Sequence, residues 1–290
     1  MMIWKQITVA NQMKYYYKLL FFFFVSMPIT AYSQKHIENA CVRASYIFSY
    51  KTQPEQTEFA KTDLMYLDIG KNSSKFYSRY QQVRDSIGDN GLEKGLPPFE
   101  INELRRGYPR GTTAVYYNFT EAQKRTITSN FSYLFVYYDE IRQLPEWLIE
   151  EQTEEISGYQ CQKASAHYLG REWVVYFTPE IPINQGPWKL WGLPGLIIEA
   201  TDKENFFKFK LTEFKKLHPH IPITFVHQTS DGKEYEKSDK ISFRKMEKLY
   251  YVDYNEFMRL FLGVKLISST RADGTKMERS IKPYIPLESW

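Results

Sequence analysis

The histidines are the side chains of this sequence that could bind a metal. Two imidazoles lie close together in His218-Pro219-His220, and His167 and His227 lie elsewhere in the second half of the chain. A zinc site needs three or four ligands at recognised spacings, and no carboxylate or third histidine stands at such a spacing here. The pattern favours solvent-exposed imidazoles, so we predict no metal ligand and no cofactor. A metal-dependent enzyme is the least favoured function.

Carboxylates and thiols could also do chemistry. Glu150, Glu151, Glu154 and Glu155 form an acidic run, which at an edge strand is more typical of protection against unwanted pairing than of an acid/base pair. The chain has no Gly-x-Ser-x-Gly motif and no phosphate-binding glycine loop. We therefore predict no catalytic residue.

Two cysteines, Cys41 and Cys161, occur in the chain, and neither has an adjacent histidine that could activate it. An oxidising compartment would permit a disulfide between them. A chain of this length can also build its core without a disulfide, so two buried thiols are the alternative.

The segment from Tyr176 to Glu199 is the most unusual in composition. It holds four prolines and three glycines, which no regular helix or strand accommodates, so we predict a built loop. Proline at 179 and 182 favours an extended, stiff arm. Leu193-Pro194-Gly195-Leu196 fits a type II turn, with Gly195 at positive φ, leading into a strand.

This loop gives the candidate binding residues, which are Glu180, Trp188, Trp191, Gly192, Leu193, Pro194, Gly195 and Glu199. The two tryptophans either plug the open end of a curved sheet or form the rim of a hydrophobic cleft. The glutamates could supply a polar contact at such a rim, although a glutamate in a loop is more often simply solvated. The sequence leaves these readings open.

Alternating apolar and polar residues predict that strands position this loop. Turn residues at Ser157-Gly158, Leu169-Gly170-Arg171 and Asp202 to Asn205 connect neighbouring runs, which favours antiparallel pairing. The predicted strands are Ala44 to Tyr50, Thr57 to Ile69, Val115 to Phe119, Thr126 to Tyr138, Trp147 to Ile156, Tyr159 to Tyr168, Trp173 to Phe177, Leu196 to Thr201, Phe207 to Thr212 and Ile223 to Gln228.

Two segments have helical periodicity. Apolar residues from Phe76 to Ile87 predict one helix, capped by Ser73 or Ser74 and ended by Gly88. A second helix is predicted from Ser242 to Gly263, with Arg244 on a solvated face together with Lys245 and Lys248. Residues 88–111, rich in glycine and proline, are expected to form an irregular connection.

The first 33 residues are typical of an export signal, with lysines before an apolar run and cleavage expected before Gln34. The apolar run is shorter than the roughly 20 residues that a spanning helix needs. Residues 1–33 carry three lysines and no acids, so the formal net charge of +4 falls to +1 after cleavage. A nearly neutral chain gives no electrostatic case for nucleic acid.

A set of short motifs runs through the second half of the chain: Gly158 to Ala164, Gly170 to Trp173, Thr178 to Ile183, Gly186-Pro187-Trp188 and the hexapeptide Gly192 to Ile197. In these motifs the sequence resembles the GLPGLI family of exported bacterial envelope proteins. The resemblance extends to Ser74 to Ser78 and to Pro286-Leu287-Glu288, where Ile285 replaces an asparagine common in the family. It implies a mostly β protein and no particular reaction.

We therefore expect a mainly β protein, with one curved or half-closed antiparallel sheet and two packed helices in a single GLPGLI-type domain over residues 34–290. The favoured function is a non-enzymatic periplasmic binding or carrier protein for a hydrophobic small molecule or peptide. The alternative is an adaptor that docks on an outer-membrane protein. We expect no transmembrane span in the mature chain.

Overall fold

The computed structural model describes residues 34–132, 134–226, 233–264 and 281–289. The chain divides into two units, Met1–Ser33 and Gln34–Trp290, and all described residues belong to the second. The predicted export signal and His227 lie outside the described residues. None of the described helices is long and apolar enough to cross a membrane.

One open sheet of twelve strands dominates the described residues, in the order β12-β6-β5-β4-β3-β2-β1-β11-β10-β9-β8-β7. Every pair is antiparallel except the short parallel pair of β12 with β6. The strands are β1 Gln34–Tyr50, β2 Lys61–Ile69, β3 Ser73–Ser78, β4 Val115–Phe119, β5 Lys124–Phe131, β6 Leu134–Ile141, β7 Leu148–Ile156, β8 Tyr159–Tyr168, β9 Arg171–Thr178, β10 Leu196–Asp202, β11 Phe207–Val226 and β12 Glu236–Lys237.

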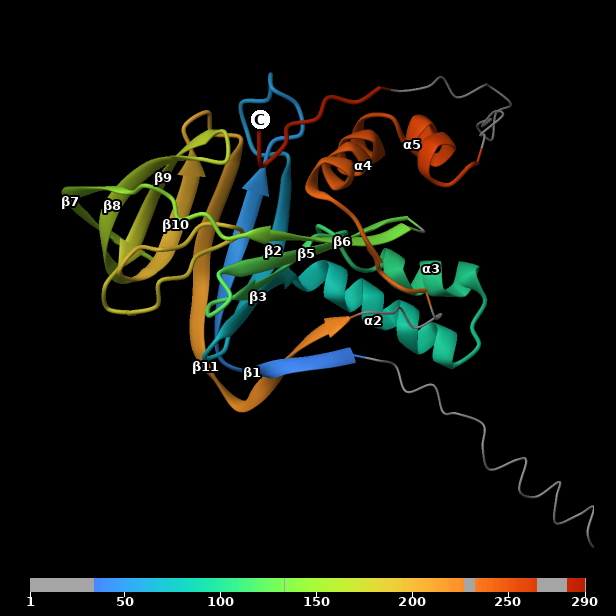
Figure 1. Ribbon diagram of the computed structural model, residues 1–290, viewed down its shortest axis with the longest axis horizontal. Coiled ribbons are helices and arrows are strands. Elements are labelled where there is room, and N and C mark those ends of the chain that lie inside the picture. The colour runs from blue at the N-terminus through green and yellow to red at the C-terminus, as the bar shows by residue number, and fades with distance from the viewer. Residues whose placement is uncertain (1–33, 133, 227–232, 265–280, 290) are drawn as a thin grey trace, which may run out of the picture. The chain divides into compact units, whose positions relative to one another are not determined.

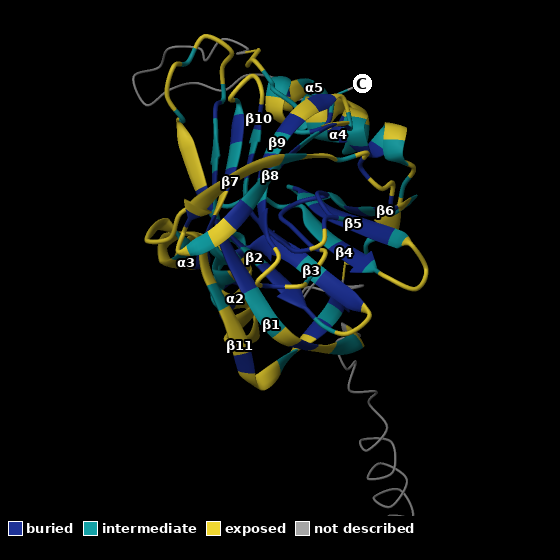
Figure 2. Ribbon diagram, turned by 90° about the vertical axis from the view of Figure 1, so that its left-hand side faces the viewer, coloured by how far each residue is buried: buried dark blue, intermediate teal, exposed yellow. Residues whose placement is uncertain are grey.

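The prediction of a mainly β fold is confirmed, and the acidic run lies on β7, which ends the sheet. The direction of the strands changes strongly across the sheet, as Figure 1 shows between β10 and β6. Strands β3 and β5 are largely buried (dark blue in Figure 2).

Tight turns connect β7 to β8 and β8 to β9, as the sequence predicted. Both central residues have positive φ in each turn, at +53° and +82° for Ser157-Gly158 and +51° and +79° for Leu169-Gly170. This is the backbone of a type I′ turn, whose twist matches that of paired strands.

Two predictions of strand extent were wrong. The run Thr126 to Tyr138 is two strands, β5 and β6, because the chain reverses after Ser132, whose φ is +61°. The runs Phe207 to Thr212 and Ile223 to Val226 are joined in the single strand β11, and the last two residues of the second predicted run lie outside the described residues. Register shifts in the β1–β11 pair let this long strand bend without ending.

The first predicted helix begins later than expected. Residues 73–78 form β3, and helix α2, Arg79–Glu93, starts after Ser78, whose side chain accepts a hydrogen bond from the Gln81 amide. Gly88 does not end the helix, because it is buried where the Arg105 side chain crosses it. Pairing of β3 with β2 therefore overrides the helical periodicity before Ser78.

The segment 88–111 is not irregular throughout, which corrects a second expectation. It contains the end of α2 and helix α3, Pro98–Arg106, which begins after Pro97 with proline in its first turn. The guanidinium of Arg105 donates to the Arg84 carbonyl at 2.8 Å, and that of Arg84 donates to the Arg105 carbonyl at 2.6 Å. The two helices thus form a hairpin.

The second predicted helix is divided into α4, Lys240–Val252, and α5, Tyr254–Phe261. Asp253 breaks it, since its side chain accepts from the Glu256 amide and caps α5. Phe243 and Phe257 bury their rings against Phe131 of β5. The described residues therefore contain four helices rather than the two expected.

The proline-rich loop lies within the main hydrophobic core. Trp188, Leu190 and Leu193 are buried in the same cluster as Trp173 of β9 and Phe209 of β11. The Tyr46 hydroxyl of β1 donates to the Ile197 carbonyl at 2.8 Å, which fixes the end of the loop to the centre of the sheet.

The predicted role of Gly195 was wrong. Its φ is not positive, and Gly192, at +96°, holds the left-handed conformation instead. Gly195 is required for space, because a Cβ there would lie 2.1 Å from the Thr178 carbonyl oxygen. Close backbone packing, rather than a type II turn, explains this glycine.

Replacing Gly195 with alanine is expected to lower the free energy of unfolding by about 1–3 kcal/mol, the usual cost of overpacking. Denaturant unfolding of Gly195→Ala would measure it. Gly107→Ala is the matched control, since a Cβ at exposed Gly107 meets nothing within 4 Å. Equal stability of the two variants would contradict this account.

Candidate functional site

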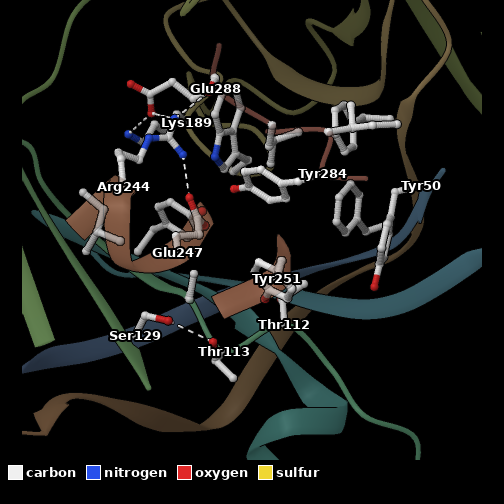
Figure 3. Close-up of a pocket in the computed structure, with 18 of the residues that line it drawn as sticks. Tyr50, Thr112, Thr113, Ser129, Lys189, Arg244, Glu247, Tyr251, Tyr284 and Glu288 are labelled. Carbon is white, nitrogen blue, oxygen red and sulfur yellow. Dashed lines mark hydrogen bonds and ion pairs between the residues drawn. The ribbon is translucent and has the colours of Figure 1, made fainter. Parts of the chain in front are cut away.

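The candidate site is a cavity of about 280 Å³ between one face of the sheet, helix α4 and residues 281–289, which we call the C-terminal strap. Figure 3 shows its polar lining. Its lining residues are Phe48, Tyr50, Lys51, Thr52, Met65, Phe76, Thr112, Thr113, Ala114, Tyr116, Ile127, Ser129, Tyr138, Trp188, Lys189, Phe207, Phe209, Phe243, Arg244, Glu247, Tyr251, Lys282, Pro283, Tyr284, Ile285, Leu287 and Glu288.

Aromatic rings from neighbouring strands form the wall on the sheet side. Phe48 of β1 stacks on Phe209 of β11 with ring centroids 4.4 Å apart, and Phe76 of β3 meets Phe209 edge-on at 6.1 Å. Phe48 and Phe209 share a face because they are directly opposite each other in the β1–β11 pair. The result is a rigid apolar surface.

The C-terminal strap covers this surface and is tied down at both ends. At one end the Lys282 amide donates to the Val252 carbonyl at 3.0 Å. At the other, the Ser289 amide and hydroxyl donate to the carbonyls of Leu169 and Gly170 at 3.0 and 2.6 Å. Between them the Arg171 guanidinium donates twice to the Pro286 carbonyl, at 3.1 and 2.6 Å.

Five charged side chains from four parts of the chain meet at one end of the cavity, and we call them the ion cluster: Glu140, Lys189, Lys240, Arg244 and Glu288. The Lys189 ammonium lies 2.7 Å from a Glu140 oxygen and 2.8 Å from a Glu288 oxygen. Lys240 also bridges the two carboxylates, and Arg244 contacts Glu288 at 3.0 Å. The cluster joins the proline-rich loop, β6, α4 and the strap.

The central ion pair of the cluster, between Lys189 and Glu288, is buried. The side chains of Lys189 and Glu288 are 2% and 5% exposed. Burial by itself would raise the pKa of the Glu288 carboxyl, but Lys189 and Arg244 outweigh it and lower that pKa to about 2. Burial would also raise the pKa of Glu140, but the charges of Lys189, Arg125 and Lys240 together with the hydrogen bond from Lys189 outweigh it and lower that pKa. Both carboxylates are therefore ionised at neutral pH.

Besides the ion cluster, the lining carries the charged side chains of Lys51, Glu247 and Lys282 and several hydroxyls. The hydroxyls of Thr113 and Ser129 are hydrogen-bonded at 2.8 Å on the sheet side (Figure 3). Tyr251 of α4 and Tyr284 of the strap stack with centroids 5.7 Å apart. Burial raises the pKa of both tyrosines, so their hydroxyls are neutral hydrogen-bonding groups.

Of the predicted binding residues, Trp188 lines the cavity. Its ring is buried against Trp173 at 5.5 Å, so the residue is both part of the core and part of the wall. Trp191 is buried elsewhere, with its indole donating to the Gln143 carbonyl at 2.9 Å and the Arg142 guanidinium 4.0 Å above its ring.

The other predicted residues do not line this cavity. Gly192, Leu193 and Gly195 build the loop, and Pro194 borders a second depression of about 630 Å³ beside Cys41 and Pro182. Glu180 accepts from the Gln160 amide, and Glu199 pairs with Lys208 at 2.7 Å. The structure thus gives both glutamates partners within the chain.

Several lining residues were missed by the sequence analysis. Arg244 was expected on a solvated face, and it is instead in the ion cluster, because the strap covers that side of α4. Lys189 gave no periodic signal, since it lies in an irregular loop. Pro286-Leu287-Glu288 was the available clue, because the resemblance already included it.

The thiols of Cys41 and Cys161 are unpaired, the first exposed and the second buried. His218 and His220 are neighbours on β11 with ring centroids 5.9 Å apart. Among the described residues, no three histidine, cysteine, aspartate or glutamate side chains gather as they would around a metal ion.

The family described as "Protein of unknown function (Porph_ging)" matches residues 170–199. This stretch holds Gly170 and Arg171, which anchor the strap, and Lys189 of the ion cluster. The match supports a likeness to an uncharacterised family over this short region. No match was found among curated proteins.

Two solved structures of PNGF-II, in the C2 and P21 space groups, resemble the chain with 12% sequence identity and TM-scores of 0.50 and 0.48. The likeness covers 73% of this chain and 34% of the other, so the chain spans about a third of the length of PNGF-II. At this identity the first structure supports a similar β-rich fold and nothing about activity.

Trp188→Ala is expected to lower the free energy of unfolding by about 3–5 kcal/mol, as other buried aromatic truncations do. Phe99→Ala, at an exposed ring of α3, is the matched control and should change it by no more than about 0.5 kcal/mol. Chemical denaturation measures both. A small effect of Trp188→Ala would show that this ring is not packed.

Glu288→Gln is expected to cost about 3–5 kcal/mol at neutral pH, because it leaves buried cations without their partner. Since the folded-state pKa of Glu288 lies below its ordinary value of 4.5, its contribution is present above pH 4.5 and is lost as the pH falls towards 2. The difference from the parent protein should therefore shrink between pH 6 and pH 3.

Unfolding curves across this pH range measure the effect, with Glu151→Gln on the exposed edge strand as the control. A stability difference for Glu288→Gln that stays constant with pH would contradict the assigned ionisation.

Proposed function

We propose that this protein is a non-enzymatic binding protein that holds a small hydrophobic ligand in the cavity under the C-terminal strap. The observation that carries the proposal is a cavity lined by many aromatic rings, on which polar and charged groups converge, a combination that suits a small-molecule site. Its volume lies near the lower end of the roughly 300–1,000 Å³ typical of such sites.

The way the cavity is built supports a preformed site. The ion cluster holds α4 and the strap at a fixed separation from the sheet, and the hydrogen bonds at Val252 and Leu169 fix both ends of the strap. A site whose walls are already placed loses less conformational entropy when a ligand enters. The aromatic rings, with few rotatable bonds, add to this preorganisation.

We also propose that the protein acts after export, in the periplasm or at the periphery of the outer membrane, since residues 1–33 have the composition of an export signal. The ligand would then be a hydrophobic molecule or a short apolar peptide of that compartment. Trp188 is the one residue of the predicted binding set that would touch it.

An adaptor remains the second candidate, and one observation favours it. Ile141, Leu144 and Leu148 expose 79%, 60% and 67% of their surface between the end of β6 and the start of the edge strand β7. Large apolar side chains that remain exposed are common at protein-binding surfaces. An adaptor would use this edge, on residues other than those that line the cavity.

Ala114→Phe provides the test of ligand binding, because a phenyl group at this lining position would occupy the cavity. A panel of lipids, apolar small molecules and apolar peptides should contain ligands that raise the melting temperature of the parent protein. Ala114→Phe should lose this response. Ala122→Phe, in the exposed turn after β4, is the matched control and should retain it.

Native mass spectrometry of protein purified from its own envelope provides the second measurement. We expect a co-purifying hydrophobic molecule at one per chain. If no molecule co-purifies with the protein and no member of the panel raises its melting temperature, the binding proposal is contradicted. The adaptor function would then be the remaining candidate.

A further inference from the structure

We infer that the ligand of the cavity is an anionic amphiphile, with a single hydrocarbon chain on the aromatic wall and a carboxylate head paired with Lys51. This inference rests on the proposed binding function and specifies its ligand. It follows from the one cation in the cavity that is nearly buried and has no acidic partner among the described residues.

Lys51 directly follows β1 and lines the cavity. Only 8% of the residue is exposed. Its backbone amide donates to the Phe206 carbonyl at 2.9 Å, and its ammonium lies 5.9 Å from the centre of the Phe206 ring. Within the described ranges its ammonium makes no hydrogen bond and no ion pair. A largely buried lysine that lacks a counter-charge favours an anion beside it.

The net charge of the lining residues also favours an anionic ligand. Four cationic residues line the cavity, Lys51, Lys189, Arg244 and Lys282, against two acidic ones, Glu247 and Glu288. Both acids are already engaged, Glu247 by Arg244 at 2.9 Å and Glu288 by the ion cluster. The net excess is thus two positive charges, and Lys51 and Lys282 carry it.

The two ends of the cavity differ in a way that orients a ligand. The ion cluster at one end satisfies its own charges, while Tyr50, adjacent to Lys51 in sequence, lies toward the other end (Figure 3). The ring of Tyr284 lies between these two ends in Figure 3, and the paired hydroxyls of Thr113 and Ser129 lie on the sheet side, below the ion cluster. A hydrocarbon chain fits this middle section, and an anionic head fits the end beside Lys51.

The test compares dodecanoate, dodecanol and dodecyltrimethylammonium, which share a chain and differ in the charge of the head group. Isothermal titration below the micellar concentration should rank dodecanoate first. Lys51→Met should weaken dodecanoate binding by roughly 10- to 100-fold, the usual contribution of a hydrogen bond to a charged group. It should leave dodecanol binding unchanged, which also shows that the variant is folded.

Two controls isolate the role of Lys51. Lys51→Arg keeps the charge and should retain the preference for dodecanoate. Lys61→Met removes an exposed lysine of β2, opposite Tyr50 in the sheet, and should have no effect, because Lys61 does not line the cavity.

Equal affinity for dodecanoate and dodecanol, or an unchanged preference in Lys51→Met, would overturn the anionic ligand while leaving hydrophobic binding in place. Failure of the parent protein to bind any of the three probes would instead count against the proposed function itself.

Discussion

The contact of Lys189 with Glu140 and Glu288 is the interaction on which the described architecture most depends. It brings together an irregular loop, a sheet strand and the C-terminal strap, which share no backbone pairing at this point. Burial of one partner without the others would leave a charge in an apolar environment, so the three segments are expected to dock together. This contact holds the C-terminal strap next to the aromatic wall of the sheet, and the cavity lies between them.

The composition of the proline-rich loop follows from the same requirement. A loop can carry a lysine into the core only if its backbone is packed closely and rigidly. Trp188 and Leu190, on either side of Lys189, are buried and fill the space around it, while Gly195 allows the backbone to approach Thr178. The short stretch that resembles an uncharacterised family therefore consists mainly of residues that anchor the fold, and two of them, Trp188 and Lys189, line the candidate site.

The sequence patterns predicted those turns and strands whose formation depends on residues close together in the chain. The turns at Ser157-Gly158 and Leu169-Gly170 and most strands follow from alternation and turn residues. Pairing between distant segments decided the rest: residues 73–78 became β3 despite helical spacing, because β2 and β4 pair with them. The cavity was not predictable for the same reason, since Arg244 and Glu288 meet only after the strap crosses α4, a contact that no spacing in the sequence encodes.

The strap has a consequence for the order of folding. β1 pairs with β11, more than 150 residues away in the sequence. Residues 281–289, which are still further along the chain, cover the aromatic wall of the cavity. Contacts between such distant segments form slowly, because long loops must close first. We expect the cavity to be completed last, so that the aromatic wall stays uncovered until residues 281–289 dock on it.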